Sequence, residues 1–190
     1  MIVRVDPTSA TSLYALAPPT SSQPNGCLSH SSTLGKEWSS CSKALNNCTA
    51  ANACNQLIIK NSKTMFMLRK NDVPLKTIDS GSTWSPLVNT PAKLTQFQTR
   101  DAAHPLGALS WSGKTLVVSG ADQSAIGRQE RSSAVFKSTD DGESWTDETG
   151  DIITVSMGMG CWYEKDYYLV TAGEGIIVRR NFEGLVAVIE

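Results

Sequence analysis

The chain has 190 residues, of which 40% are hydrophobic and 18% charged, a composition typical of a soluble globular domain with one sizeable core. Its net charge of −1 and the absence of any Lys- or Arg-rich run argue against nucleic acid as a partner. No apolar segment is long enough to cross a bilayer, and residues 1–7 carry a charge and a proline where a signal peptide has its apolar core. If the parent protein is secreted, we expect this chain to have lost its leader.

The first module of the chain begins with two short apolar segments, 2–5 and 12–16, which we predict to be paired strands. A stretch rich in proline and serine follows, and residues 31–38 form a polar turn that ends on Trp38. Residues 39–55 are polar and without period. We therefore predict an inserted loop there, held by cross-links rather than by a core.

Four of the five cysteines lie in or near this loop: Cys27, Cys41, Cys48 and Cys54. Their spacing fits no zinc finger or ribbon, because no Cys-x-x-Cys pair is present and His30 has no partner at ligand spacing. We expect two disulfides of open connectivity and no metal site, with free thiols in a reducing compartment as the alternative. In the same loop, Asn47 begins an Asn-Cys-Thr sequon and is a candidate for glycosylation.

The second module consists of three short predicted strands, a turn and a long connection. The strands are expected near residues 56–60, 63–69 and 74–76, with Asn, Ser and Asp supplying the turns between them. A polar turn at 77–84 ends on Trp84, and the connection at 85–105 follows.

The third and fourth modules repeat this order. Strands are predicted at 107–111, 115–119 and 134–137 in the third module, and near 160–163, 167–171, 175–179 and 185–189 in the fourth. A polar loop at 120–133 interrupts the third module, and its turn at 138–145 ends on Trp145. No segment has sustained helical periodicity, so we expect minimal helix.

The same four residue types recur at the same offsets in two turns. They are Thr77, Asp79, Gly81 and Trp84 in one turn, and Ser138, Asp140, Gly142 and Trp145 in the other. The Asp can accept hydrogen bonds from backbone N–H groups, the Gly can adopt a positive φ, and the Trp returns to the core. A third copy at 31–38 has Thr33 in place of the Asp, and a fourth at 180–184 keeps the glycine and a preceding strand.

These turns resemble the Asp-box, also called the bacterial neuraminidase repeat. Proteins with this repeat include sialidases, sortilin-type receptors, xyloglucanases and photosystem assembly factors, and they are β-propellers. The resemblance implies an all-β fold of four-stranded antiparallel blades, each with an Asp-box turn. It also implies that the eight residues of the two good copies have structural roles, because the boxes of such propellers lie opposite the binding face.

We predict a single propeller segment over 1–190, with about four blades at 1–55, 56–105, 106–152 and 153–190. Most propellers close with more blades, and an open arc leaves apolar blade faces uncovered. The alternatives are a four-bladed ring, association with a second copy, or a piece of a larger propeller. We favour the last.

The loops expected on the binding face carry seven polar side chains that could hold a carboxylate or a sugar. These candidate ligand-binding residues are Arg100, Asp101, His104, Asp122, Arg128, Glu130 and Arg131. The alternative is that these loops are charged because they face water.

The leading functional hypothesis is a non-catalytic, secreted or luminal propeller segment that binds a protein or carbohydrate and needs no cofactor. One alternative is a fragment of a sialidase-like glycoside hydrolase, although the Phe- or Tyr-Arg-Ile-Pro motif of sialidases is absent. Catalytic residues are not identified, because Tyr163, Tyr167 and Tyr168 fall on predicted strands, where packing is the expected role. A second alternative is an assembly factor for a membrane complex.

Overall fold

The computed structural model describes residues 1–22, 24–41, 45, 48–49, 54–69, 73–91, 107–121, 133–150, 157–171, 175–179 and 182. Within these ranges the chain forms β-strands and turns and no α-helix, as the lack of helical periodicity predicts. A search of the same residues for a helix that could span a membrane finds none.

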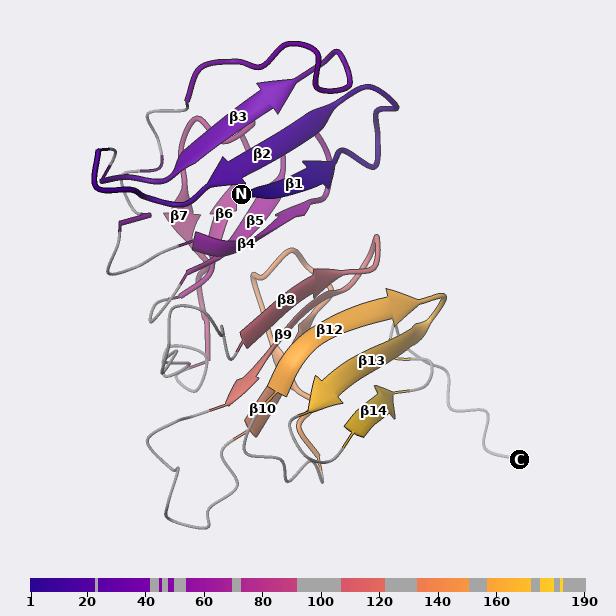
Figure 1. Ribbon diagram of the computed structural model, residues 1–190. Coiled ribbons are helices and arrows are strands. Elements are labelled where there is room, and N and C mark those ends of the chain that lie inside the picture. The colour runs from indigo at the N-terminus through magenta and orange to yellow at the C-terminus, as the bar shows by residue number, and fades with distance from the viewer. Residues whose placement is uncertain are drawn as a thin grey trace. The chain divides into compact units, whose positions relative to one another are not determined.

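The strands form four antiparallel sheets, two in each of two compact units, Met1–Val88 and Asn89–Glu190. The first unit contains β1 (Ile2–Val5), β2 (Leu13–Ala17) and β3 (Cys27–Ser31), and then β4 (Cys54–Ile59), β5 (Met65–Arg69), β6 (Leu75–Thr77) and β7 (Ser85–Pro86) (Figure 1). The second unit contains β8 (Gly107–Trp111), β9 (Leu116–Ala121), β10 (Ser133–Ser138) and β11 (Thr146–Asp147), and then β12 (Met157–Tyr163), β13 (Asp166–Thr171) and β14 (Gly175–Arg179).

Each sheet is a meander in which every strand pairs with the next strand along the chain. The sheet orders are β1-β2-β3, β4-β5-β6-β7, β8-β9-β10-β11 and β12-β13-β14. In a meander, successive connections alternate between the two ends of the sheet. The connections from first to second strand and from third to fourth strand therefore share one end of each sheet.

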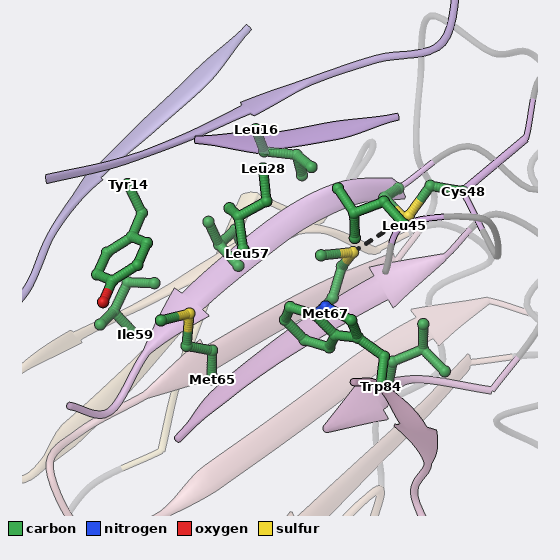
Figure 2. Packing of buried hydrophobic residues seen from close by; sticks show 12 residues of the cluster. Tyr14, Leu16, Leu28, Leu45, Cys48, Leu57, Ile59, Met65, Met67 and Trp84 are labelled. Atoms are coloured by element: carbon green, nitrogen blue, oxygen red, sulfur yellow. Dashed lines mark hydrogen bonds between the residues drawn. A yellow bond between two sulfur atoms is a disulfide. The ribbon is translucent and has the colours of Figure 1, made fainter. Parts of the chain in front are cut away.

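The core of the first unit lies between its two sheets. Leu16 and Leu28 project from β2 and β3 toward Leu57, Met65 and Met67 of β4 and β5, as Figure 2 shows. All five side chains are buried. Because side chains alternate between the faces of a strand, one face of each sheet supplies this apolar layer.

The core of the second unit lies between the β8–β11 sheet and the β12–β14 sheet, with aromatic rings on the β12–β14 side. Val117 and Val135 pack with Tyr167, Leu169 and Phe182. The rings of Tyr167 and Phe182 stack with their centroids 5.5 Å apart. Burial raises the pKa of the Tyr167 phenol, which is consequently neutral at physiological pH.

One glycine in this core has no room for a side chain. A Cβ added to Gly160 of β12 would overlap the hydroxyl and ring of the buried Tyr167. We predict that Gly160→Ala lowers the free energy of unfolding by about 1–3 kcal/mol, as overpacking does in other cores. Urea unfolding measures the loss. In a Tyr167→Phe background the loss should be smaller, because the atom with the closest overlap is gone, and an equal loss would contradict this packing.

Candidate functional site

The sheets have two chemically different ends. The strands β3, β6 and β10 finish on buried hydroxyl residues, Ser31, Thr77 and Ser138, and we call this the turn end. We call the opposite end, where β3 and β4 begin with Cys27 and Cys54, the loop end.

At the turn end, the turn at 138–145 is held by a network of side-chain hydrogen bonds. The Ser138 hydroxyl donates to Asp140 Oδ1 at 2.8 Å and accepts the N–H of Gly142 at 2.8 Å. Asp140 Oδ1 also accepts the N–H of Ser144 at 2.9 Å, and Oδ2 accepts the Ser144 hydroxyl at 2.5 Å. Both carboxylate oxygens are therefore used inside the turn.

The turn at 77–84 has the same network. The Thr77 hydroxyl donates to Asp79 Oδ1 at 2.7 Å and accepts the N–H of Gly81 at 3.0 Å. Asp79 in turn accepts the N–H of Thr83 at 2.8 Å and the Thr83 hydroxyl at 2.6 Å. The Trp84 indole N–H donates to the Gly81 carbonyl at 3.2 Å, and Trp84 is buried. The Trp145 indole N–H has no such partner among the described residues.

The degenerate copy at 31–38 keeps this geometry without the carboxylate. Ser31 Oγ accepts the N–H of Gly35 at 2.9 Å, and Thr33 Oγ1 accepts the N–H of Glu37 at 2.9 Å. Thr33 thus takes the acceptor position of the Asp. The Trp38 indole donates to the Gly35 carbonyl at 3.0 Å, but Trp38 itself is exposed.

All three turns share two consecutive residues with positive φ, of which the second is glycine. The φ values are 61° and 85° at Asp141 and Gly142, and 62° and 84° at Ser80 and Gly81. At Leu34 and Gly35 of the degenerate copy they are 54° and 85°. The first φ of each pair is close to the left-handed helical value, which a residue with a Cβ can adopt at some cost, whereas the larger φ at the second position is occupied by glycine in all three turns.

The hydrogen bonds change the acidity of both aspartates. The Thr83 hydroxyl and N–H, and then the Thr77 hydroxyl, lower the pKa of Asp79 from 3.8 to about 2. The Ser144 hydroxyl is the main group that lowers the pKa of Asp140, also to about 2. Hydrogen bonds donated to a carboxylate favour its charged form, so both groups are ionised at physiological pH.

A backbone hydrogen bond connects two of these turns, 31–38 and 77–84, to the preceding hairpin of their sheets. The N–H of Leu34 donates to Thr11 O at 3.1 Å, and that of Ser80 donates to Lys63 O at 3.1 Å. In the fourth sheet Phe182 N–H donates to Lys165 O at 2.8 Å. Gly184, the glycine of the predicted fourth copy, lies outside the described residues.

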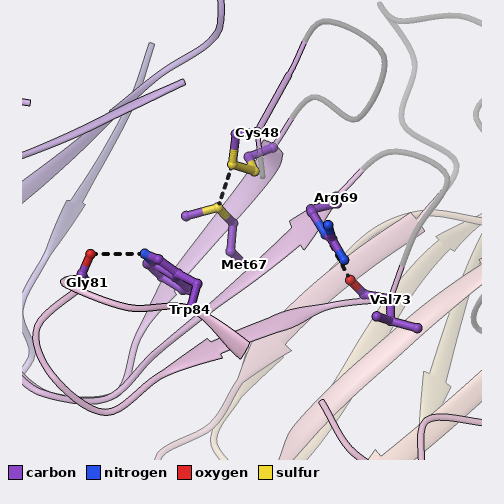
Figure 3. Close-up of a disulfide and its surroundings, with 7 residues drawn as sticks. Cys48, Met67, Arg69, Val73, Gly81 and Trp84 are labelled. Carbon is purple, nitrogen blue, oxygen red and sulfur yellow. Dashed lines mark hydrogen bonds between the residues drawn. A yellow bond between two sulfur atoms is a disulfide. The ribbon is translucent and has the colours of Figure 1, made fainter. Parts of the chain in front are cut away.

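Two disulfides brace the loop end of the first unit: Cys27–Cys41 and Cys48–Cys54. Cys41 is exposed, whereas Cys48 is fully buried against Met67, with their sulfur atoms 3.3 Å apart (Figure 3). A disulfide sulfur has no hydrogen to donate, so this is a packing contact. The fifth cysteine, Cys161 of β12, is free and exposed.

The residues just before β3 also pair through their backbone with the cysteine-rich segment. Gly26 N–H donates to Cys48 O at 2.7 Å, and Asn25 forms an isolated bridge with Thr49. A Cβ at Gly26 would lie 2.9 Å from the Cβ of Cys48, so the close approach requires glycine. Asn47, the candidate glycosylation site, lies outside the described residues.

Arg69 is a loop-end residue that sequence reasoning does not single out. It ends β5 opposite Cys54, is only 9% exposed, and donates from Nε to Val73 O at 3.2 Å (Figure 3). A guanidinium stays charged even when buried and presents several donors in a fixed plane. The only signal in the sequence is a charge that closes the apolar run 65–68.

The seven predicted ligand-binding residues, 100, 101, 104, 122, 128, 130 and 131, all lie outside the described residues. The strand ends next to their segments are described. Gly107, which follows the first segment, pairs with Gly120, and Ala121 and Ser133, which flank the second, pair with each other. Both segments therefore adjoin the loop end of the β8–β11 sheet. No cluster of three His, Cys, Asp or Glu suited to a metal occurs among the described residues.

Solved structures with the same arrangement of strands are β-propellers. The GH74 xyloglucanase from Xanthomonas campestris superposes with a TM-score of 0.60 and 16% identity, over 88% of this chain and 26% of that one. An ancestral GH74 enzyme gives 0.55 and 16%, over 92% and 24%. YCF48 from Cyanidioschyzon merolae gives 0.53 and 11%, over 94% and 56%. No protein-family model matches the chain, and no curated protein matches its sequence significantly.

At these identities the likeness shows the fold alone. The chain has the architecture of a β-propeller, and its four sheets are blades. It spans about a quarter of the two GH74 chains and about half of the YCF48 chain. This extent is consistent with a partial propeller.

The aspartate pKa values predict how stability depends on pH. Because the folded pKa of Asp140 lies below its unfolded value, its stabilising contribution is present above about pH 4 and lost as pH falls towards 2. We predict that Asp140→Asn lowers the free energy of unfolding by about 1 kcal/mol at pH 7 and by less near pH 2. Urea unfolding at both pH values measures this, with Asp141→Asn as the neighbouring control. A loss that does not depend on pH would contradict the assignment.

Proposed function

We propose that the chain is a non-catalytic Asp-box propeller segment that recognises a protein or carbohydrate outside the cytosol through its loop end. The observation that supports this proposal most directly is that the polar side-chain atoms of the Asp-box motif already form hydrogen bonds within their own turns. Asp79 and Asp140 direct their carboxylates into turn hydrogen bonds, which leaves the boxes as scaffold. We therefore assign recognition to the loop end.

Three features of the loop end support this assignment. The disulfides fix the cysteine-rich segment of the first unit, and a fixed loop loses less conformational freedom when it binds. Arg69 supplies a buried positive charge beside that segment. In the second unit, the segments that carry the seven candidate residues adjoin the loop end, where Arg128 and Arg131 could pair with a carboxylate.

The two disulfides also support the proposed location. Disulfides form and persist in oxidising compartments and are rare in the cytosol. One of the bonds, Cys27–Cys41, includes the exposed Cys41, which a reducing environment could reach. We therefore place the protein in a secreted or luminal setting, where glycosylation of Asn47 would also be possible.

A glycoside hydrolase is the second candidate, favoured by the likeness to two GH74 enzymes. This chain spans about a quarter of each, so the catalytic residues of such an enzyme would come in part from other segments. An assembly factor for a membrane complex is a third candidate. In each case the remaining blades, from a longer chain or from a second copy, would complete the propeller.

A binding screen tests the leading proposal. The probes are immobilised xyloglucan oligosaccharides, sialosides and acidic peptides, applied to the oxidised chain. We expect Arg128→Ala together with Arg131→Ala to weaken binding to the retained probe about 10- to 100-fold, because each removes a charge-assisted hydrogen bond. Lys63→Ala, an exposed change at the turn end, is the matched control and should have no effect.

Two results would contradict the proposal. One is loss of binding on Lys63→Ala with full binding by the double Arg variant, which would place recognition at the turn end. The other is turnover of a fluorogenic sialoside or release of reducing ends from xyloglucan, which would establish an enzyme.

A further inference from the structure

The last blade presents an apolar face to solvent. Register places Cys161 of β12 beside Tyr168 of β13 and Val178 of β14, and Val170 beside Ile176 on the same side. We call this the β13 face. Val170 is 47% exposed and Ile176 is 64% exposed, so cross-strand neighbours form an uncovered apolar surface. Surfaces of this kind mark interaction sites.

The first blade presents a second such face. Val3 of β1 pairs with Ala15 of β2, and Val5 pairs with Leu13, with Ser31 of β3 in the same row. We call this the β1 face. Val3 and Val5 are exposed, by 41% and 62%, whereas Ala15 and Ser31 of the same face are buried. The β1 face carries smaller side chains than the β13 face.

The packing inside each unit shows which faces fit together. In the first unit, the face of the second sheet that carries the turn hydroxyl Thr77, together with Leu75, packs on β1–β3. The face of β1–β3 that it covers carries Leu16 and Leu28, and lies opposite the turn hydroxyl Ser31. The rule is that the hydroxyl face of one blade covers the non-hydroxyl face of the blade before it.

In the second unit, the covered face follows the same rule. Tyr167 and Leu169 pack on Val117 and Val135, which lie on the face of β8–β11 opposite the turn hydroxyl Ser138. In this contact large aromatic side chains of one blade meet smaller side chains of the other. In both units, therefore, the earlier blade is covered on the face opposite its turn hydroxyl.

The two uncovered faces are of opposite kinds under this rule. The β1 face carries the turn hydroxyl Ser31, so it is the kind that covers a preceding blade. The β13 face is the remaining face of β12–β14, the kind that a following blade covers. Among the described strand residues of both faces, Asp166 at the hairpin end is the one charged side chain. Both faces are therefore almost uncharged, as an apolar contact between them requires.

We infer that the β13 face of one copy docks on the β1 face of a second copy, head to tail, with the polarity of the internal blade contacts. Ile176 and Val170 of the β13 face would meet the exposed Val3 and Val5 of the β1 face. A contact between two different faces is heterologous, so both faces of every copy are used only if the assembly closes or continues. This inference does not depend on the ligand proposed above.

Sedimentation velocity over a range of concentrations tests the inference on the oxidised chain. We expect the wild type to change from monomer to at least dimer as concentration rises. Val170→Lys and Val5→Lys should each weaken association more than about tenfold, because each would bury an unpaired charge in an apolar contact. Ile78→Lys, at an exposed position outside both faces, is the control and should associate like the wild type.

Mixing the two face variants gives the sharper result. A Val170→Lys copy keeps its β1 face and a Val5→Lys copy keeps its β13 face, so the mixture should form a one-to-one complex that neither variant forms alone. Circular dichroism and thermal melting check that each variant is folded. A wild type that stays monomeric at every concentration would overturn the inference. So would association that Val170→Lys abolishes and Val5→Lys leaves intact, which would indicate that the β13 face pairs with itself.

Discussion

The structure depends on one hydrogen bond at the ends of β3, β6 and β10, in which a buried hydroxyl accepts the N–H of a glycine four residues later. Ser31, Thr77 and Ser138 make this bond at 2.8–3.0 Å. Removing such a bond would leave a buried polar group unpaired, which costs more than the bond contributes. The positive φ at each glycine follows from the same geometry, and so does the direction in which the chain leaves the blade.

This constraint separates the turn scaffold from the loop end, where we propose that recognition occurs. The aspartates of the turns complete a local network and hold low pKa values for that reason, so their prominence in the sequence says little about ligands. In the first three sheets the same turns fix which face carries the hydroxyl. Fold, loop end and uncovered faces are therefore linked by a single repeated local structure.

Much of this architecture could be predicted from the sequence, because turns with fixed offsets and strands of period two are local signals. Thr77 with Asp79 and Ser138 with Asp140 indicated both turns, and even the copy with Thr33 keeps the bond pattern. The cysteine connectivity could not be predicted, since spacing alone does not select among the possible pairings of four cysteines, even though Cys27–Cys41 and Cys48–Cys54 each join cysteines that are consecutive in the sequence. Arg69 was missed because burial at a strand end is a tertiary property. The seven ligand-binding candidates remain a prediction, because charge alone does not distinguish a binding loop from a solvated one.

Amide hydrogen exchange at Gly35, Gly81 and Gly142, read by NMR, tests the central claim most directly. If the hydroxyl-to-glycine bond organises the three blades that contain it, all three amides will exchange far more slowly than in an unfolded chain, including Gly35 in the copy that lacks the aspartate. Exchange of these amides at the unprotected rate, in a chain whose strand amides are protected, would contradict the account.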